Sequence, residues 1–417
     1  MNNMQEKSSV PAIRFNGFTE DWEQRKLGEL ADIIGGGTPS TNNNSFWDGD
    51  IDWYAPAEIG TKIYLDSSER KITAEGFNNC SAKMLPVGTV LFTSRAGIGK
   101  TAILAKEGCT NQGFQSIVPH EKELDSYFIF SRTEELKRYG EVTGAGSTFV
   151  EVSGKQMANM DIMMPSTIDE QKQIGSYFKK IDTLITLHQR KYSQLCNIKK
   201  SMLEKMFPRE GATVPEIRFV GFTDDWEQRK LGELMNVTSV KRIHQSDWTD
   251  SGVRFFRARD IVAASKNEEL DDYLYISKEK YEEYSALSGK VAIGDLLVTG
   301  VGTIGVPYLV ENVEPLYFKD GNIIWFQNQN EIDGKYLYYS FIGNGIQSFI
   351  KASAGTGTVG TYTIDTGKKT PIQLPSKEEQ KKIGEYLSQL DHLITLHQRE
   401  LERLQNIKKA CLEMMFV

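Results

Sequence analysis

The chain has 417 residues, of which 39% are apolar and 25% charged, and its formal net charge is −7. These values are typical of a globular protein with more than one domain, and no early run is apolar enough for a signal peptide or a membrane span. The four cysteines form no CxxC pair, so neither a disulfide framework nor a zinc cluster is indicated. We therefore expect a cytoplasmic protein.

The first predicted segment, residues 1–30, contains a motif that the chain uses twice. PAIRFNGFTEDWEQRKLGEL at positions 11–30 matches PEIRFVGFTDDWEQRKLGEL at positions 215–234 in 17 of 20 positions. We call these two copies the opening motifs. A short polar helix is expected to begin after Trp22 and after Trp226, and the aromatic residues are expected to pack against a long helix. Contact with a partner protein is the alternative.

Each opening motif leads into a segment about the size of one small domain, residues 31–164 and 235–370. Here the two halves diverge. Short β-rich runs alternate with helical patterns and Gly-rich loops, which predicts a mixed α/β domain in each half. The β-rich runs are 89–94, 295–299 and 322–326. The helical patterns are 127–138 and 336–350, and the Gly-rich loops are 35–39, 143–148 and 353–360.

Residues 165–207 and 371–417 are each predicted to contain one long helix, and residues 208–234 connect the two halves through a linker and the second opening motif. Positions 171–207 and 380–416 are identical at 22 of 37 places. Neither copy contains an internal Pro, and both begin after acidic residues. Apolar side chains recur every seven residues, which predicts a helix-pairing seam. The residues of this seam are Ile174, Ile181, His188, Leu195, Ile383, Leu390, His397 and Leu404.

A helix of this length spans roughly 55 Å at about 1.5 Å per residue and is too one-sided to be stable alone. Because the helix is repeated, an antiparallel pair about a pseudo-two-fold axis satisfies both seams. His188 and His397 would meet near the midpoint. No Cys, Asp or Glu converges with them at ligand spacing, so we favour a register-setting polar layer over a metal site. The predicted fold class is α+β: two mixed α/β domains separated by two long helices that form an antiparallel coiled coil.

One stretch imitates a phosphate-binding loop. SRAGIGKT at 94–101 follows a strand-like run, but Ser94 replaces the leading Gly of GxxxxGK[ST], and the following residues are too few for the helix that must face the phosphates. The matching residues 302–307 read GTIGVP, without Lys. We therefore predict a strand, a turn and a strand in both halves.

Other catalytic signals are missing from the sequence. There is no Pro-Pro dipeptide, so the Asp/Asn-Pro-Pro-aromatic motif of amino-methyltransferases is absent, and there is no GxGxxG after a strand and no HExxH. The five histidines are dispersed. We predict that the chain is not an enzyme and has no catalytic, cofactor-binding or metal-binding residues.

The duplicated arrangement closely resembles the specificity subunit of type I restriction-modification systems. The resemblance is carried by the EQxxIG starts of the long helices (Glu170-Gln171 and Glu379-Gln380), by the WEQRKLGEL ends of the opening motifs and by the divergent domains between them. It covers nearly the whole chain.

The resemblance implies a DNA reader. Residues 31–164 and 235–370 would be target recognition domains, each reading one half of a split, asymmetric site in double-stranded DNA. The partners would be two methyltransferase (modification) subunits and two restriction (motor and nuclease) subunits. S-adenosylmethionine, ATP and Mg would bind to those partners and not to this chain, and the chain would scaffold the complex.

The charges of the two domains qualify this expectation. Residues 31–164 hold 12 Lys and Arg against 17 Asp and Glu, and residues 235–370 hold 14 against 17, so the net charges are −5 and −3. Phosphate neutralisation supplies much of nonspecific DNA affinity, so the cations must gather on one face or the partners must contribute. Arg suits guanine and Asn suits adenine. The predicted DNA contacts are Thr38, Asn42, Asn43, Asn44, Arg95, Lys100, Lys241, Arg242, Arg254, Arg257 and Arg259.

Two other functions stay open at this point. The chain could be a coiled-coil adaptor whose variable domains bind proteins rather than DNA. It could also be an ATP-dependent DNA enzyme, which would rest only on the defective match at Gly99-Lys100-Thr101.

Overall fold

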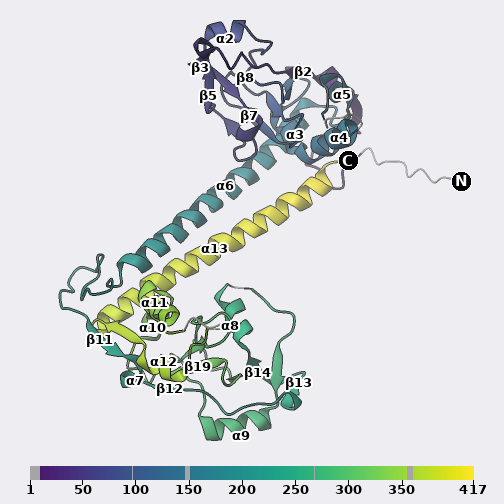
Figure 1. The fold of residues 1–417 in the computed structure, drawn as a ribbon. Helices are drawn as coiled ribbons and strands as arrows, with labels where there is room; N and C mark the ends of the chain where they lie inside the picture. The colour runs from purple at the N-terminus through teal and green to yellow at the C-terminus, as the bar shows by residue number, and fades with distance from the viewer. Residues whose placement is uncertain (1–9, 96, 146–150, 267, 355–359) are drawn as a thin grey trace, which may run out of the picture. The chain divides into compact units, whose positions relative to one another are not determined.

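A computed structural model describes residues 10–95, 97–145, 151–266, 268–354 and 360–417. The chain forms two compact units, each shown in Figure 1. The first unit comprises Met1–His188 and Glu400–Val417, and the second comprises Gln189–Arg399. Each unit therefore contains one of the two domains at residues 31–164 and 235–370, a part of the long helix that follows it, and a part of the other long helix.

The first unit is built on two sheets. The larger sheet has the order β2-β9-β6-β7-β4, with only the β4–β7 pair parallel, and the smaller has the order β5-β3-β8. The strands of the larger sheet are β2 (Ala31–Gly35), β9 (Gln115–Pro119), β6 (Val90–Phe92), β7 (Thr101–Leu104) and β4 (Tyr64–Leu65). Those of the smaller sheet are β5 (Arg70–Ile72), β3 (Trp47–Tyr54) and β8 (Cys109–Thr110). The short helices of the first unit are α1 (Leu27–Leu30), α2 (Ala74–Asn78), α3 (Ser126–Ser131), α4 (Thr133–Gly144) and α5 (Gly154–Ala158).

The second unit repeats this plan with different proportions. Its sheets have the orders β12-β19-β16-β17 and β13-β15-β14-β18. Their strands are β12 (Asn236–Thr238), β19 (Ile323–Gln327), β16 (Leu296–Thr299), β17 (Pro307–Leu309), β13 (Trp248–Thr249), β15 (Leu274–Ile276), β14 (Val253–Phe256) and β18 (Leu316–Phe318). Its short helices are α7 (Leu231–Leu234), α8 (Ala258–Ser265), α9 (Lys278–Ser288), α10 (Gly334–Ile342), α11 (Asn344–Ser353) and α12 (Ile364–Lys369).

The predicted strands are confirmed, whereas the predicted short helices need correction. The β-rich runs form β6, β16 and β19. Each helical pattern is divided into two helices, at Arg132 between α3 and α4 and at Gly343 between α10 and α11. Arg132 leaves helical geometry because its buried guanidinium bonds to the Met163 carbonyl and to Glu135.

The residues after each opening tryptophan are not the helix that we predicted. The first copy of EQRK forms β1 (Glu23–Lys26), which pairs antiparallel with β10 (Asp161–Met164). The second copy forms β11 (Glu227–Lys230), which pairs antiparallel with β20 (Pro371–Leu374). The helices α1 and α7 begin only afterwards, at LGEL. The strand conformation is imposed by a partner strand more than a hundred residues away.

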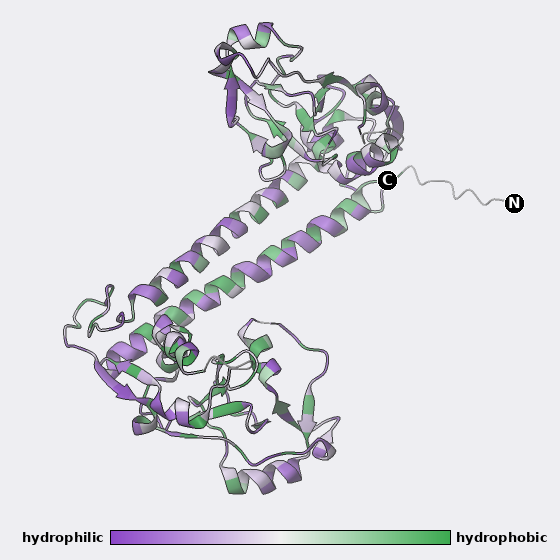
Figure 2. Ribbon diagram, in the orientation of Figure 1, coloured by the Kyte–Doolittle hydropathy of each residue, from purple (hydrophilic) through white to green (hydrophobic). Residues whose placement is uncertain are grey.

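The long helices are confirmed as α6 (Ile168–Lys205) and α13 (Lys377–Met415). Acidic residues occupy the first turn of both, where they interact favourably with the helix dipole. Hydrophilic and hydrophobic residues alternate along both helices (Figure 2). No helix within the described ranges is long and apolar enough to cross a membrane.

The ends of the long helices are packed into the cores of the units. In the first unit, Trp22 lies edge-on to Phe416, near the end of α13, and the backbone of Ile13 donates to the Met414 carbonyl at 2.9 Å. In the second unit, Trp226 lies edge-on to Phe207, just after α6. Both tryptophans are buried, which confirms the prediction that the opening aromatics pack against a long helix.

A buried ion pair joins each opening motif to the start of the long helix of its own half. The Arg14 guanidinium donates to both Glu170 oxygens at 2.7 and 2.8 Å, and Arg218 does the same to Glu379. Glu170 and Glu379 are almost completely buried. Two parallel hydrogen bonds fix orientation as well as distance.

A second polar contact joins three elements within each unit. In the first unit, Tyr127 on α3 donates to Asp182 on α6 at 2.9 Å, and Lys408 on α13 pairs with the same carboxylate at 2.6 Å. In the second unit, Tyr339 and Lys199 surround Asp391 in the same way. Burial and the neighbouring carboxylate raise the pKa of Tyr127, so its phenol remains a donor.

The packing of the long helices is antiparallel within each unit. In the first unit, Tyr177 meets Cys411 and Asp182 meets Lys408, so residue numbers rise on one helix as they fall on the other. The seam residues Ile174, Ile181, Leu195, Ile383 and Leu390 are buried. Leu404, His188 and His397 are half-buried.

Three apolar residues that each follow a seam residue by three positions are more exposed than the seam. Leu184, Ile198 and Leu393 are 40–44% exposed. His188 and His397 fall in different units, and their mutual approach stays a prediction, as does a coiled coil along the full helix length.

Replacing one partner of the buried Arg14–Glu170 pair should destabilise the first unit selectively. Arg14→Met leaves the Glu170 carboxylate buried without its cation, which costs about 3–5 kcal/mol of unfolding free energy. Hydrogen exchange should accelerate in the first unit, and Arg218→Met should accelerate it in the second. The control is Arg25→Met, which removes a half-exposed arginine whose ion pairs are worth about 0–1 kcal/mol. Equal exchange in Arg14→Met and Arg25→Met would contradict the role of this pair.

Candidate nucleic-acid interface

In each unit, three loops gather at one edge of one sheet, which we call the loop edge. This sheet is the five-stranded one in the first unit and β12-β19-β16-β17 in the second. In the first unit, β2 ends at Gly35 opposite the start of β9, and β6 ends at Phe92 opposite the start of β7. The loop edge of the first unit therefore comprises residues 36–39, 94–95, 97–100 and 111–114. In the second unit, the equivalent strand ends bring together residues 239–243, 300–306 and 319–322.

The central loop of the edge has the same hydrogen bonds in both units. The Thr93 hydroxyl donates to the Gly97 carbonyl at 2.7 Å and accepts from the Lys100 amide at 2.9 Å. The Thr299 hydroxyl contacts Thr303 and Val306 in the same way, at 2.5 and 2.9 Å. One threonine thus closes a turn between two paired strands, which confirms the predicted strand, turn and strand.

This geometry differs from a phosphate-binding loop. Thr101 begins strand β7, whereas a phosphate-binding loop needs a helix whose amides face the phosphates. The Gly99 amide donates to the Thr93 carbonyl at 3.0 Å, so it is already used within the turn.

The Gly-rich loop 35–39 has a packing role. A Cβ atom on Gly36 would lie 1.9 Å from the Asn111 carbonyl oxygen, and one on Gly37 would lie 2.4 Å from the Ala82 nitrogen. Only glycine allows these backbones to approach so closely. Of the predicted loops 143–148 and 353–360, residues 146–148 and 355–359 lie outside the described residues.

Three of the predicted DNA contacts in the first unit lie on its loop edge. Thr38 bonds to Gln112, Arg95 is about half exposed and pairs with Glu151 at 2.9 Å, and Lys100 is exposed. Asn42, Asn43 and Asn44 lie further along the connection from β2 to β3. Asn43 caps a short 3-10 helix by accepting from the Ser45 amide, whereas Asn42 and Asn44 are exposed.

A hollow of about 740 Å³ lies beside the central loop of the first unit. Arg95, Lys100, Lys137 and Lys408 give it a basic lining, which Glu134 and Glu141 partly offset. Lys137 was not among the residues that we predicted from sequence. Its position became apparent only because α4 packs against Gly99.

The predicted contacts of the second unit are divided between two places. Lys241 and Arg242 lie on the loop edge, where Lys241 covers the Tyr284 ring at 4.5 Å and Arg242 pairs with Asp320 at 3.0 Å. Arg254 lies instead on β14, in the other four-stranded sheet, and its guanidinium stacks on Tyr273, 3.9 Å from the ring centre. Arg257 and Arg259 both pair with Asp272. Whether these residues touch DNA stays a prediction.

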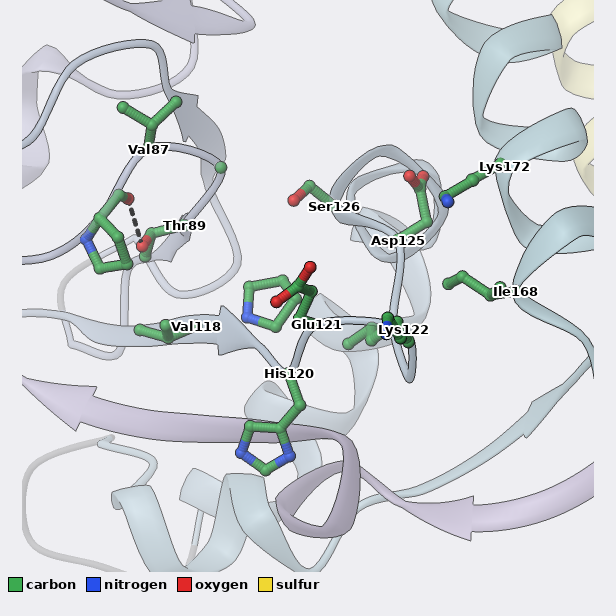
Figure 3. A pocket seen from close by; sticks show the side chains of 14 residues that line it. Val87, Thr89, Val118, His120, Glu121, Lys122, Asp125, Ser126, Ile168 and Lys172 are labelled. Atoms are coloured by element: carbon green, nitrogen blue, oxygen red, sulfur yellow. Dashed lines mark hydrogen bonds between the residues drawn. The ribbon is translucent and has the colours of Figure 1, made fainter.

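A second hollow in the first unit, of about 410 Å³, contains residue types that could suggest catalysis (Figure 3). His120 and Ser126 both line it, but Figure 3 shows the His120 ring turned away from Ser126. The two ring nitrogens lie 3.2 Å from the Glu29 carbonyl and 3.2 Å from Asp32. With both nitrogens engaged, His120 does not form a nucleophile and base pair with Ser126.

Two carboxyl groups with shifted pKa values are structural. Burial would raise the pKa of Asp52, but hydrogen bonds from Ser68 and the ammonium groups of Lys106 and Lys71 lower it to about 2. Burial raises the pKa of Asp295, which accepts from Trp325 and from two backbone amides. Neither carboxyl lines a hollow described above.

The described residues contain no group of three or more His, Cys, Asp or Glu side chains that could hold a metal ion. The cysteines in them are free thiols.

Comparison with known families decides which family this chain, with its duplicated loop edge, belongs to. The family model of the type I restriction modification DNA specificity domain matches residues 19–197 and, again, residues 223–406. The chain belongs to this family. The two matches correspond to the two halves found in the sequence.

Relatives agree with this assignment. The MjaIX specificity subunit of Methanocaldococcus jannaschii is 30% identical over 256 residues, which span 58% of this chain and 59% of that relative. The MjaVIII specificity subunit of the same organism is 23% identical over 95% of this chain and 92% of its own length. The crystal structure of a type I S subunit from M. genitalium covers 98% of this chain and 99% of its own, with a TM-score of 0.55 and 15% identity, which supports the fold.

The central loop of this specificity subunit should not bind nucleotide. Because Thr93 and β7 replace the features of a phosphate-binding loop, we expect no saturable ATP binding by the purified chain. Lys100→Ala should therefore leave ATP association at background in equilibrium dialysis. Saturable binding by the unmodified chain that Lys100→Ala abolishes would contradict this interpretation.

Proposed function

We propose that the chain reads a split, asymmetric site in double-stranded DNA, with each compact unit reading one half. The observation that carries this proposal is the loop edge, which is present twice on the same strand framework but with different side chains. A duplicated frame with divergent loops is expected when two modules perform the same task on different targets.

The chain supplies recognition and assembly, and its partners supply catalysis. His120 and the perturbed carboxyls are engaged in structural contacts, and the central loop lacks the form of a nucleotide site. S-adenosylmethionine would serve methyl transfer on modification subunits, and ATP and Mg would serve restriction subunits. We infer that the complex acts in the cytoplasm, where its DNA substrate lies.

The long helices carry a repeated apolar surface that suits a repeated partner. Leu184 and Leu187 on α6 are 44% and 59% exposed, and their counterparts Leu393 and Leu396 on α13 are 40% and 47% exposed. Exposed leucines of this kind are typical of protein contacts. Because the same residues occur once in each half, they support the docking of two copies of one subunit.

The acidic balance of the recognition domains also favours a shared DNA interface. Their net charges of −5 and −3 provide little general attraction for phosphates. Basic groups on the modification subunits would then supply part of the affinity, while the loop edges supply sequence discrimination.

Methylome sequencing of the source cell, with and without this gene, tests the proposed function. Deletion should abolish adenine methylation at one bipartite motif, and a plasmid-borne copy should restore it. A control deletion that removes only the restriction subunit should leave that motif methylated. An unchanged methylome after deletion of this gene, with the modification genes still expressed, would overturn the proposal.

A further inference from the structure

The loop edge holds one cross-loop pair at the same place in each unit. Thr38 and Arg242 each lie eight residues after the last leucine of an identical WEQRKLGEL motif. Both follow a strand that pairs antiparallel in equivalent register, with Asp32 opposite Val118 and Asn236 opposite Gln327. The two residues are therefore structural equivalents.

The residues that they contact are also equivalent. The Asn111 amide donates to the Tyr54 carbonyl at 3.1 Å, and the Lys319 amide donates to the Phe256 carbonyl at 2.9 Å, which marks the same point after a parallel strand. The next residue is Gln112 in the first unit and Asp320 in the second.

The chemistry of the pair differs between the units. The Thr38 hydroxyl donates to Gln112 Oε1, whereas Arg242 Nε donates to Asp320 Oδ2 at 3.0 Å. Both contacts lie at the exposed surface. The equivalent pair thus presents a neutral amide, from Gln112, in the first unit and a guanidinium, from the other loop, in the second. Two readers that differ in this way would select different bases.

We propose that these cross-loop pairs read base edges in the major groove: Gln112, positioned by Thr38, reads an adenine, and Arg242, positioned by Asp320, reads a guanine. This inference rests on the proposed function and assigns its recognition chemistry.

The Arg242–Asp320 pair is arranged for guanine. The Asp320 carboxylate accepts from Nε, and the Arg242 side chain is 68% exposed, so the fork is accessible to a ligand. A guanidinium fork donates two parallel hydrogen bonds to guanine O6 and N7. Asp320 is only 18% exposed, so it is fixed in the loop and orients the fork before DNA arrives. Ordering the side chain in advance lowers the entropy cost of the contact.

The Thr38–Gln112 pair is arranged for adenine. A glutamine amide donates from Nε2 to adenine N7 and accepts from N6 at Oε1. Thr38 donates to one lone pair of Oε1, which fixes the amide and leaves Nε2 for the base. The adenine read in this way would be a stacked base, distinct from the target adenine that a methyltransferase must extrude.

Tethering of the loops does not explain these pairs. Other hydrogen bonds already hold the same loops: the Gly37 amide donates to the Thr110 carbonyl at 2.9 Å, and the Tyr317 hydroxyl donates to the Lys241 carbonyl at 2.8 Å. The side-chain pairs add little further restraint, so their exposed donors are free to serve a ligand.

The test is to map methylation motifs for variants of the chain expressed with its modification subunits. Arg242→Gln should lower the preference for one guanine in one half-site by roughly 5- to 150-fold, the range for one bidentate base contact, while the other half-site keeps its sequence. Gln112→Ala should relax one adenine position in the opposite half-site. Asp320→Asn should weaken the same guanine preference as Arg242→Gln, but to a smaller extent.

The matched control is Arg229→Gln. Arg229 also donates from Nε to a carboxylate, Glu233, at 3.0 Å, but it lies on β11 in the opening motif, away from the loop edge. It should leave both half-sites unchanged. Arg242→Lys provides a second variant that keeps the charge but lacks the fork, and it should also lose guanine preference.

The outcomes separate this inference from the proposed function. If complexes with Arg242→Gln or Arg242→Lys still methylate the original motif with full preference for the guanine, the pairs are not base readers. The proposed function would survive that result. If the unmodified chain directs no bipartite methylation, the proposed function fails. An equal loss of preference at every position of both half-sites would also overturn the inference, because it would indicate a general loss of DNA affinity.

Discussion

Each recognition domain is held in place by the burial of a helix end that belongs to the other half of the chain. Phe416 packs against Trp22 in the first unit, and Phe207 packs against Trp226 in the second. Tyr127, Asp182 and Lys408 then join the recognition domain and both helices at one carboxylate. Because the core of each unit includes a helix end from the other half of the chain, neither half is complete without the other.

This constraint separates what must stay constant from what can vary. The opening motifs, the buried Arg–Glu pairs and the helix ends hold the domains, and their residues are nearly identical in the two halves. The strands that follow keep their register and the threonine-closed turn. The loops that project from this frame are then free to differ in charge and hydrogen bonding, as Thr38–Gln112 and Arg242–Asp320 do. A fixed frame with variable loops is how binding specificity changes without a change of fold.

Much of the fold could be predicted from the sequence because the chain is duplicated. The long helices, the β-rich runs and the strand-turn-strand at residues 94–101 were all visible as local patterns, and the second copy checked each of them. The strand at EQRK was not predictable locally, because β10 lies 135 residues further along the chain. The break at Arg132 depends on a contact with Met163, which also lies in a distant segment.

The candidate site was only partly predictable for the same reason. Thr38, Arg95, Lys100, Lys241 and Arg242 were named from residue type alone, and the fold places them on the loop edges. Gln112 and Asp320 were missed because each becomes significant through a partner some 75 residues away.

The central claim is that the two units read DNA independently, and exchanging one recognition domain tests it most directly. Residues 31–164 would be replaced by the corresponding domain of another specificity subunit, with both opening motifs and both long helices retained. Methylome mapping of the hybrid complex should then show one new half-site beside one unchanged half-site. A hybrid that methylates efficiently with both half-sites rewritten, or with both unchanged, would contradict the claim.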